Sequence, residues 1–134
     1  MSFLLAAFIF EDVGVTAYRG AAPLLNNKTI LSAAAGLLGT EAYHASNIRT
    51  QIFDAGATAQ DAAQKISDLR DTLDGSGDDD QGVVLNGMAN IVPTDGNGLV
   101  FARTAAQVLA IVYFSRTAKK GGFFPNGINT GRSS

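Results

Sequence analysis

Three side chains in the first third of the sequence have the types and the spacing of metal ligands. Glu41 and His44 stand three residues apart within a long helical pattern, so their side chains share one face of that helix. Glu11 stands inside the preceding helical pattern, and the turn between the two patterns falls near residue 26. Because Glu11 and Glu41 are equally far from that turn, an antiparallel helix pair brings them to the same height. Carboxylates combined with imidazole suit iron, manganese or zinc, so these three residues are the candidate metal ligands.

A single Glu-x-x-His is a weak motif, and a second interpretation stays open. Burying an isolated carboxylate in an apolar stripe costs on the order of several kcal/mol, as it does for any unpaired charge. Each glutamate therefore needs a partner. That partner is either a metal ion or a hydrogen-bond donor such as Tyr18, Tyr43 or Arg49, unless the carboxylate reaches the surface. The tyrosines are also candidates for groups that support the ligands.

The number of ligands favours a metal shared between two hairpins. Carboxylate-bridged di-iron and di-manganese bundles take one Glu from each of two helices and a Glu-x-x-His from each of the other two. This sequence offers one of each and contains a single histidine. Two copies of the chain, or one copy and a similar hairpin from another chain, would supply the whole set.

The helices that carry these ligands are predicted over residues 3–25 and 28–53, where apolar residues recur at three- and four-residue spacing. Pro23 places the end of the first helix near Ala22. Asn26 and Asn27 supply a turn and a helix N-cap. Asp12 lies one residue off the apolar face and is predicted to be solvated or at an edge.

The remaining sequence predicts shorter elements. A third helix is expected over residues 59–73 with Thr58 as N-cap, and a fourth over 105–115 opened by a capping box of Thr104 and Gln107. Residues 83–103 have no sustained period, and residues 121–127 are glycine-rich with two phenylalanines, which predicts an extended arm. The third helix is expected to turn one set of residues inward, Ala62, Ile66, Leu69 and Leu73, and to expose another, Asp61, Lys65, Asp68, Arg70 and Asp71.

Composition excludes several classes of function. The 134 residues fit one domain, and a net charge of −2 gives no case for nucleic acid. The absence of cysteine excludes disulfides, and no serine nucleophile motif is present. The acidic loop from Asp74 fails as an EF-hand because its sixth position is Asp79 and its twelfth is Leu85, so a solvated loop is expected.

The N-terminus does not resemble a membrane or export segment. The apolar run Ser2 to Phe10 is too short to span a bilayer, and it lacks the basic region and cleavage site of a signal peptide. No transmembrane segment is therefore expected, and the localisation stays undetermined, with export open to a processed chain.

Several segments together resemble plant and bacterial desiccation-related proteins with a ferritin-like domain. The similarity runs in order through most of the chain, and its last segments are not explained by helix periodicity. The segments are Phe10 to Tyr18, Gly20 to Leu25, Glu41-Ala42-Tyr43-His44-Ala45, Asn90 to Asp95, Arg103-Thr104 and Gly121 to Gly127.

The resemblance implies an all-α, ferritin-like four-helix bundle with a dimetal centre, in which Glu11, Glu41 and His44 form the second half of the ligand set. The first two helices here resemble the third and fourth of that bundle, so residues 1–56 are predicted to be a ferritin-like hairpin, half of the bundle. Residues 57–134 are predicted to be an extension of short helices, loops and the arm, packed on it. Such a half-bundle would expose an apolar stripe. We therefore expect an obligate homodimer or higher oligomer, or a complex with a chain that supplies the missing hairpin.

The expected function is that of a stress- or desiccation-associated, dimetal-binding protein, with iron or manganese ahead of zinc. The alternative is a metal-free scaffold, in which the hairpin and the Phe123-Phe124 arm serve assembly. The two hypotheses differ at Glu41, since a ligand tolerates replacement by Gln poorly for metal loading.

Overall fold

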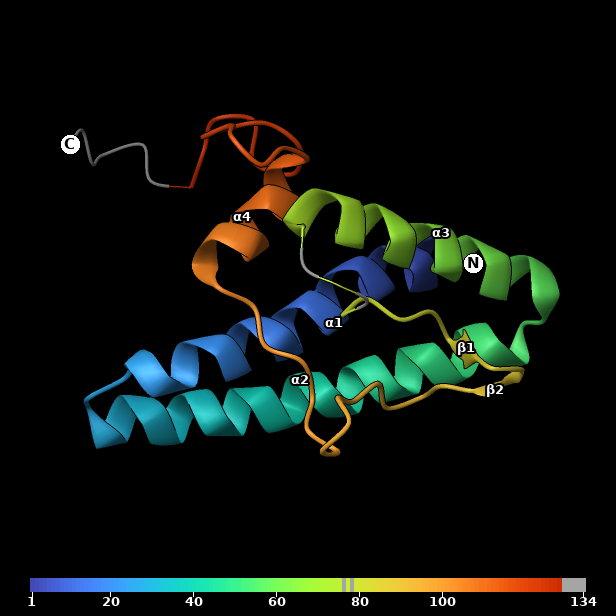
Figure 1. Ribbon diagram of the computed structural model, residues 1–134, viewed down its shortest axis with the longest axis horizontal. Helices are drawn as coiled ribbons and strands as arrows, with labels where there is room; N and C mark the ends of the chain where they lie inside the picture. Colours follow the sequence, from blue (N-terminus) through green and yellow to red (C-terminus); the bar gives the residue numbers. More distant parts are fainter. Residues whose placement is uncertain (76, 78, 129–134) are drawn as a thin grey trace.

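The computed structural model describes residues 1–75, 77 and 79–128, and the predicted all-α fold is confirmed. Four helices dominate: α1 (Ser2–Ala21), α2 (Lys28–Asp54), α3 (Ala57–Asp74) and α4 (Ala105–Tyr113) (Figure 1). A two-stranded antiparallel hairpin, β1 (Val84–Leu85) and β2 (Met88–Ala89), lies between α3 and α4 in the sequence. None of the helices in these described ranges is long and apolar enough to cross a membrane.

Helices α1 and α2 form the expected antiparallel hairpin and lie side by side in Figure 1. Helix α1 ends at Ala21, where a 3-10 turn over Ala22–Leu24 takes in Pro23, which cannot donate a helical hydrogen bond. The side chain of Asn27 then caps α2 by accepting hydrogen bonds from the backbone N–H groups of Thr29 and Ile30. Both predicted boundaries of the turn are therefore confirmed.

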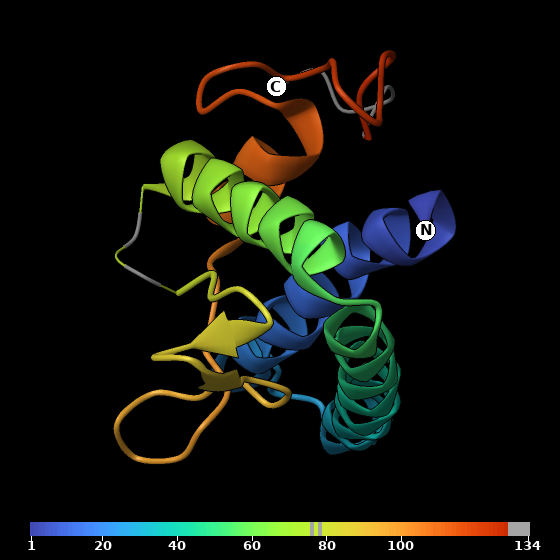
Figure 2. The same cartoon turned by 90° about the vertical axis from the view of Figure 1, so that its right-hand side faces the viewer.

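Helix α3 lies over the half of the hairpin that holds the start of α1 and the end of α2 (Figure 2), and it packs there with a face that differs from the predicted one. Its N-cap is Gly56, whose φ is 88°, and no side chain caps it, so the prediction of Thr58 as N-cap is wrong. Ala63 and Ser67 are completely buried, whereas Leu69 is exposed. Small side chains let α3 approach closely, and this favours them over the larger residues that the apolar period selected. The shared core consists of Phe8, Ile48, Ile52, Ala59, Ala63 and Val83.

Three buried arginines hold the elements together through three aspartates. Arg49 of α2 and Arg70 of α3 both contact Asp12 Oδ2 of α1, from Nη1 at 2.8 Å and from Nη2 at 3.2 Å. The prediction that Arg70 is solvated is therefore wrong, and Asp12, predicted to be solvated or at an edge, is mostly buried in this cluster. The equal numbers of guanidinium and carboxylate groups leave the cluster neutral, which is how buried charges are compensated.

The same cluster extends into the acidic loop. Arg70 Nε lies 2.7 Å from Asp80 Oδ1, and Arg103 Nε lies 2.9 Å from Asp74 Oδ2. Arg103 also pairs with Asp80 and donates to the hydroxyl of Thr16 on α1. Asp80 is buried, so the prediction of a solvated loop is wrong for this residue; Ser76 and Asp78 of that loop lie outside the described residues.

The C-terminal segment folds back onto its own chain. The Thr104–Gln107 capping box is confirmed, and α4 ends where Phe114 adopts a left-handed φ of 53°. Phe123 donates its backbone N–H to the Val112 carbonyl, and its ring packs against Phe10 and Phe114 with centroids 4.6 and 4.9 Å away. A bridge between Gly121 and Phe124 closes a tight turn. The segment therefore packs against α1 and α4 of its own chain, and it does so through a tight turn and not in an extended form.

Candidate metal centre

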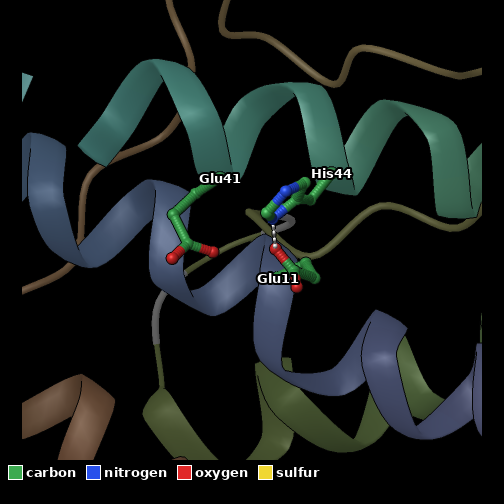
Figure 3. Close-up of side chains that lie close together, drawn as sticks. All are labelled: Glu11, Glu41 and His44. Atoms are coloured by element: carbon green, nitrogen blue, oxygen red, sulfur yellow. Dashed lines mark ion pairs between the residues drawn. The ribbon is translucent and has the colours of Figure 1, made fainter. Parts of the chain in front are cut away.

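The hairpin brings the three predicted ligands together (Figure 3). Glu11 projects from α1, and Glu41 and His44 project toward it from α2. One ligand atom from each of the three lies within 4.8 Å of the others. The equal spacing of Glu11 and Glu41 from the turn produces this convergence, and the three-residue spacing of Glu41 and His44 places both on the face that meets α1.

One oxygen of the Glu11 carboxylate, Oε2, has none of the expected hydrogen-bond donors within the part of the chain that the structure describes. His44 Nδ1 lies 3.4 Å from Glu11 Oε2, an ion-pair distance that is longer than a well-formed hydrogen bond. This oxygen is buried and has no hydrogen-bond partner among the described residues. Arg49 is engaged by Asp12 and by backbone carbonyls, and the side chain of Tyr43 is 81% exposed. Neither residue therefore satisfies Glu11 Oε2.

The electrostatics of the pair of acids favour a cation. Burial raises the pKa of Glu11, and the neighbouring Glu41 carboxylate raises it further. His44 acts in the opposite direction and lowers the pKa of Glu11. Two acids and one imidazole thus share a site in which negative charge is only partly compensated, and a bound cation would stabilise both carboxylates in their ionised form.

Close packing of the helices fixes the position of Glu41. A Cβ atom added to Gly14 of α1 would lie 3.2 Å from Glu41 Oε2, so the carboxylate rests directly on the backbone of the opposite helix. On another side of α1, Asp12 binds Arg49 of α2 and holds the two helices in register. The register that aligns Glu11 with His44 is therefore set by the neighbouring buried ion pair.

The site opens outward. The His44 side chain is 57% exposed, whereas that of Glu11 is 23% exposed. Both line a shallow groove together with residues from the start of α1 and the second half of α2: Met1, Phe3, Leu4, Asn47, Ile48 and Gln51. The groove places the imidazole within reach of a partner or of solvent.

A second group of acids differs from this site in its partners. Oxygens of Asp71, Asp74 and Asp80 also lie within 4.8 Å of one another. Asp74 and Asp80 form ion pairs with Arg103, and Asp80 also pairs with Arg70. Asp74 and Asp80 therefore anchor buried arginines, and Asp71 accepts a hydrogen bond from the Asp80 backbone N–H. Sequence reasoning missed them because the arginines and aspartates are far apart in the chain and follow no motif.

Comparison with known proteins agrees with this arrangement of helices. Residues 1–54 match the family model of the ferritin-like domain. All three candidate ligands lie within that ferritin-like segment. The chain is 27% identical over 146 aligned positions to the ferritin-like catalase Nec2 of Nesocodon mauritianus, an alignment that covers 96% of this chain and 47% of the relative.

The chain is also similar to a desiccation-related protein, PCC13-62 of Craterostigma plantagineum. The identity is 30% over 125 aligned positions, covering 81% of this chain and 40% of the relative. The resemblance to ferritin-like desiccation-related proteins is therefore confirmed, and the chain spans less than half the length of either relative. No solved structure matches the chain significantly.

Proposed function

We propose that the ferritin-like hairpin binds iron or manganese through Glu11, Glu41 and His44, as one half of a dinuclear centre. The observation that carries this proposal is the buried Glu11 Oε2, which lies beside a second carboxylate and an imidazole and has no hydrogen-bond partner in the described part of the chain. A divalent cation would supply the missing partner. It would also offset the burial and the neighbouring Glu41 carboxylate, which raise the pKa of Glu11.

The donor set fits such an ion. Two carboxylates and one imidazole suit iron and manganese, which favour oxygen and nitrogen donors. The chain offers one Glu and one Glu-x-x-His, half of the set in dimetal carboxylate bundles. The other half would come from a second hairpin, in a homo-oligomer or from another chain.

Hydrogen peroxide is the substrate that we propose to test first, because one relative is named a ferritin-like catalase. In that reaction one peroxide is oxidised to oxygen and the other is reduced to two waters, so the two electrons and two protons released by the first are consumed by the second. Bound iron or manganese would supply the reversible electron transfer. Glu11, Glu41 and His44 would hold that ion.

Metal content per chain decides between this function and a metal-free scaffold. The 134-residue protein would be purified without chelator, and then incubated with Mn²⁺, or with Fe²⁺ under anaerobic conditions. We expect about one ion per chain, and at least a tenfold loss of affinity in Glu41→Gln, since altering even the groups that support a ligand typically costs 10–100-fold. Asp61→Asn, which alters an exposed acid on α3, is the matched control. No uptake by a well-folded protein would refute the proposal and favour the scaffold.

A further inference from the structure

The segment that follows β2 encloses a pocket against the helical hairpin. Residues 91–101 run past α2 (Figure 1), and the end of this segment is fixed to α1 through backbone groups. Arg19 of α1 donates to the Val100 carbonyl, and the Arg103 backbone N–H donates to the Thr16 carbonyl at 3.0 Å. Between the segment and the hairpin lies a cavity of about 40 Å³. The residues that line it differ from those that line the groove beside the candidate ligands.

The wall of this pocket is mainly apolar. Asp12, Asp80 and Arg103 line it too, but their charged groups are engaged in the buried Arg–Asp cluster. The Thr16 hydroxyl accepts a hydrogen bond from Arg103 and donates to backbone carbonyls of its own helix. These polar groups are therefore bonded within the chain. The apolar side chains come from α1, α2 and the segment, and include Val15, Ala42, Ala45, Ile91, Val100 and Phe101.

The volume and the lining restrict what the pocket can hold. A water molecule needs roughly 10–15 Å³ and two to four polar partners, so this cavity has room for about three non-hydrogen atoms. Among the lining side chains, Ser46 and Asp79 have no hydrogen-bond partner in the described part of the chain, and both are partly exposed to bulk solvent. Water inside the pocket would thus give up hydrogen bonds, whereas an apolar molecule would gain dispersion contacts with the wall.

We propose that this pocket binds an uncharged apolar molecule of about two or three non-hydrogen atoms, the size of dissolved dioxygen. Val92 lines the pocket and is 61% exposed, so the pocket reaches the surface and a small molecule can enter while the segment stays folded. So few atoms bind weakly, and the dissociation constant should be about 1 mM or higher. The site uses neither Glu11, Glu41 nor His44, and it is therefore independent of the proposed metal binding.

Xenon, an uncharged apolar atom, is the first probe of this pocket. Amide chemical shifts of the ¹⁵N-labelled 134-residue chain would be followed as the xenon pressure rises, in EDTA so that no metal takes part. We expect saturable shifts at Ala42, Ala45 and Val100. Dioxygen is the second probe, and its paramagnetism should selectively broaden the signals of the same amides. Xenon shifts without this broadening would overturn the proposal, because dioxygen is smaller and equally apolar.

Three variants test whether the pocket itself is the site. Ala42→Leu adds three carbon atoms to the wall and should weaken xenon binding at least about tenfold by filling the space. Ala35→Leu makes the same change at an exposed position of α2, seven residues earlier, and should match the wild type. Val100→Ala enlarges the pocket and should keep or strengthen xenon binding, so it tests the site even where Ala42→Leu fails to fold.

Two results would overturn the proposal. The first is xenon shifts that persist in a helical Ala42→Leu, which would place the bound xenon elsewhere. The second is a wild-type chain without a saturable xenon response whose lining amides show cross-peaks to long-lived water, which would show that the pocket is hydrated. Circular dichroism of each variant establishes that the helices are retained.

Discussion

Replacing Asp12 by Asn removes one of three negative charges from the buried Arg–Asp cluster while keeping the shape of the side chain. Arg49 and Arg70, whose side chains are 0% and 2% exposed, both contact Asp12 Oδ2. The change leaves the cluster with a net positive charge. Breaking a buried ion pair costs about 3–5 kcal/mol. Because Asn can still accept one hydrogen bond, and Arg49 keeps its contacts to the Asn90 and Gly82 carbonyls, we expect the lower end, about 3 kcal/mol.

Urea denaturation followed by circular dichroism measures this loss. Asp61→Asn is the control, because Asp61 pairs with Lys65 at 2.7 Å with both side chains more than half exposed. Such a surface pair is worth about 0.3–0.5 kcal/mol. The m-value should stay constant in both variants, so that the midpoint reports stability. A midpoint for Asp12→Asn that matches Asp61→Asn would show that the cluster does not stabilise the fold, and the reasoning would be wrong.

Three further substitutions test close packing and the cost of the candidate site. A Cβ at Gly20 would lie 1.9 Å from the Arg103 carbonyl oxygen, so Gly20→Ala should destabilise by about 2–4 kcal/mol, as misfitting Gly replacements and overpacking do. In contrast, Gly36→Ala, with open space around it, should stabilise α2 by up to about 1 kcal/mol; equal midpoints in urea would contradict this. The raised pKa of Glu11 means that the folded state binds its proton more tightly than the unfolded state, so its contribution to stability is present in acid and lost as the pH rises through the folded pKa. The metal-free Glu11→Gln variant should therefore be more stable than the wild type at pH 7 by about 1 kcal/mol, which raises its melting temperature by a few degrees. This difference in melting temperature should disappear toward pH 4. A difference that grows in acid would show that the pKa of Glu11 is not raised in the folded state.

Local signals in the sequence predicted the hairpin well. Pro23 ends α1 and the side chain of Asn27 caps the start of α2. Both effects act over a few residues, so the local sequence is enough to predict them. The convergence of Glu11 on Glu41 follows from the same turn, because helix geometry converts equal spacing into equal height. The role of these residues as metal ligands stays a prediction, since convergence alone does not identify an ion.

The tertiary ion cluster could not be predicted by the same means. An apolar period assigns charged residues to the surface, so it placed Arg70 in the solvent and selected Leu69 for the core. In the fold, α3 presents Ala63 and Ser67 to the hairpin, and their small volume leaves room for the Arg70 guanidinium to lie 4.7 Å from the Phe8 ring centroid and to reach Asp12. That arrangement depends on contacts between α1, α2, α3 and the loop after α3, and no window of sequence contains them all.

Buried charges are compensated on one side of the hairpin and only partly compensated on the other, and this contrast links the fold to the proposed function. On the side of α1 that faces α3, each aspartate of the Arg–Asp cluster forms an ion pair with a guanidinium. These charges are therefore compensated within the chain, and the ion pairs hold α3 and the later loops against the hairpin. On the other side, Glu11 and Glu41 share one imidazole, which is itself more than half exposed. The excess negative charge there has no compensation among the described side chains of the site and lies in a groove that Phe3 also lines. A cation is the component that would compensate it.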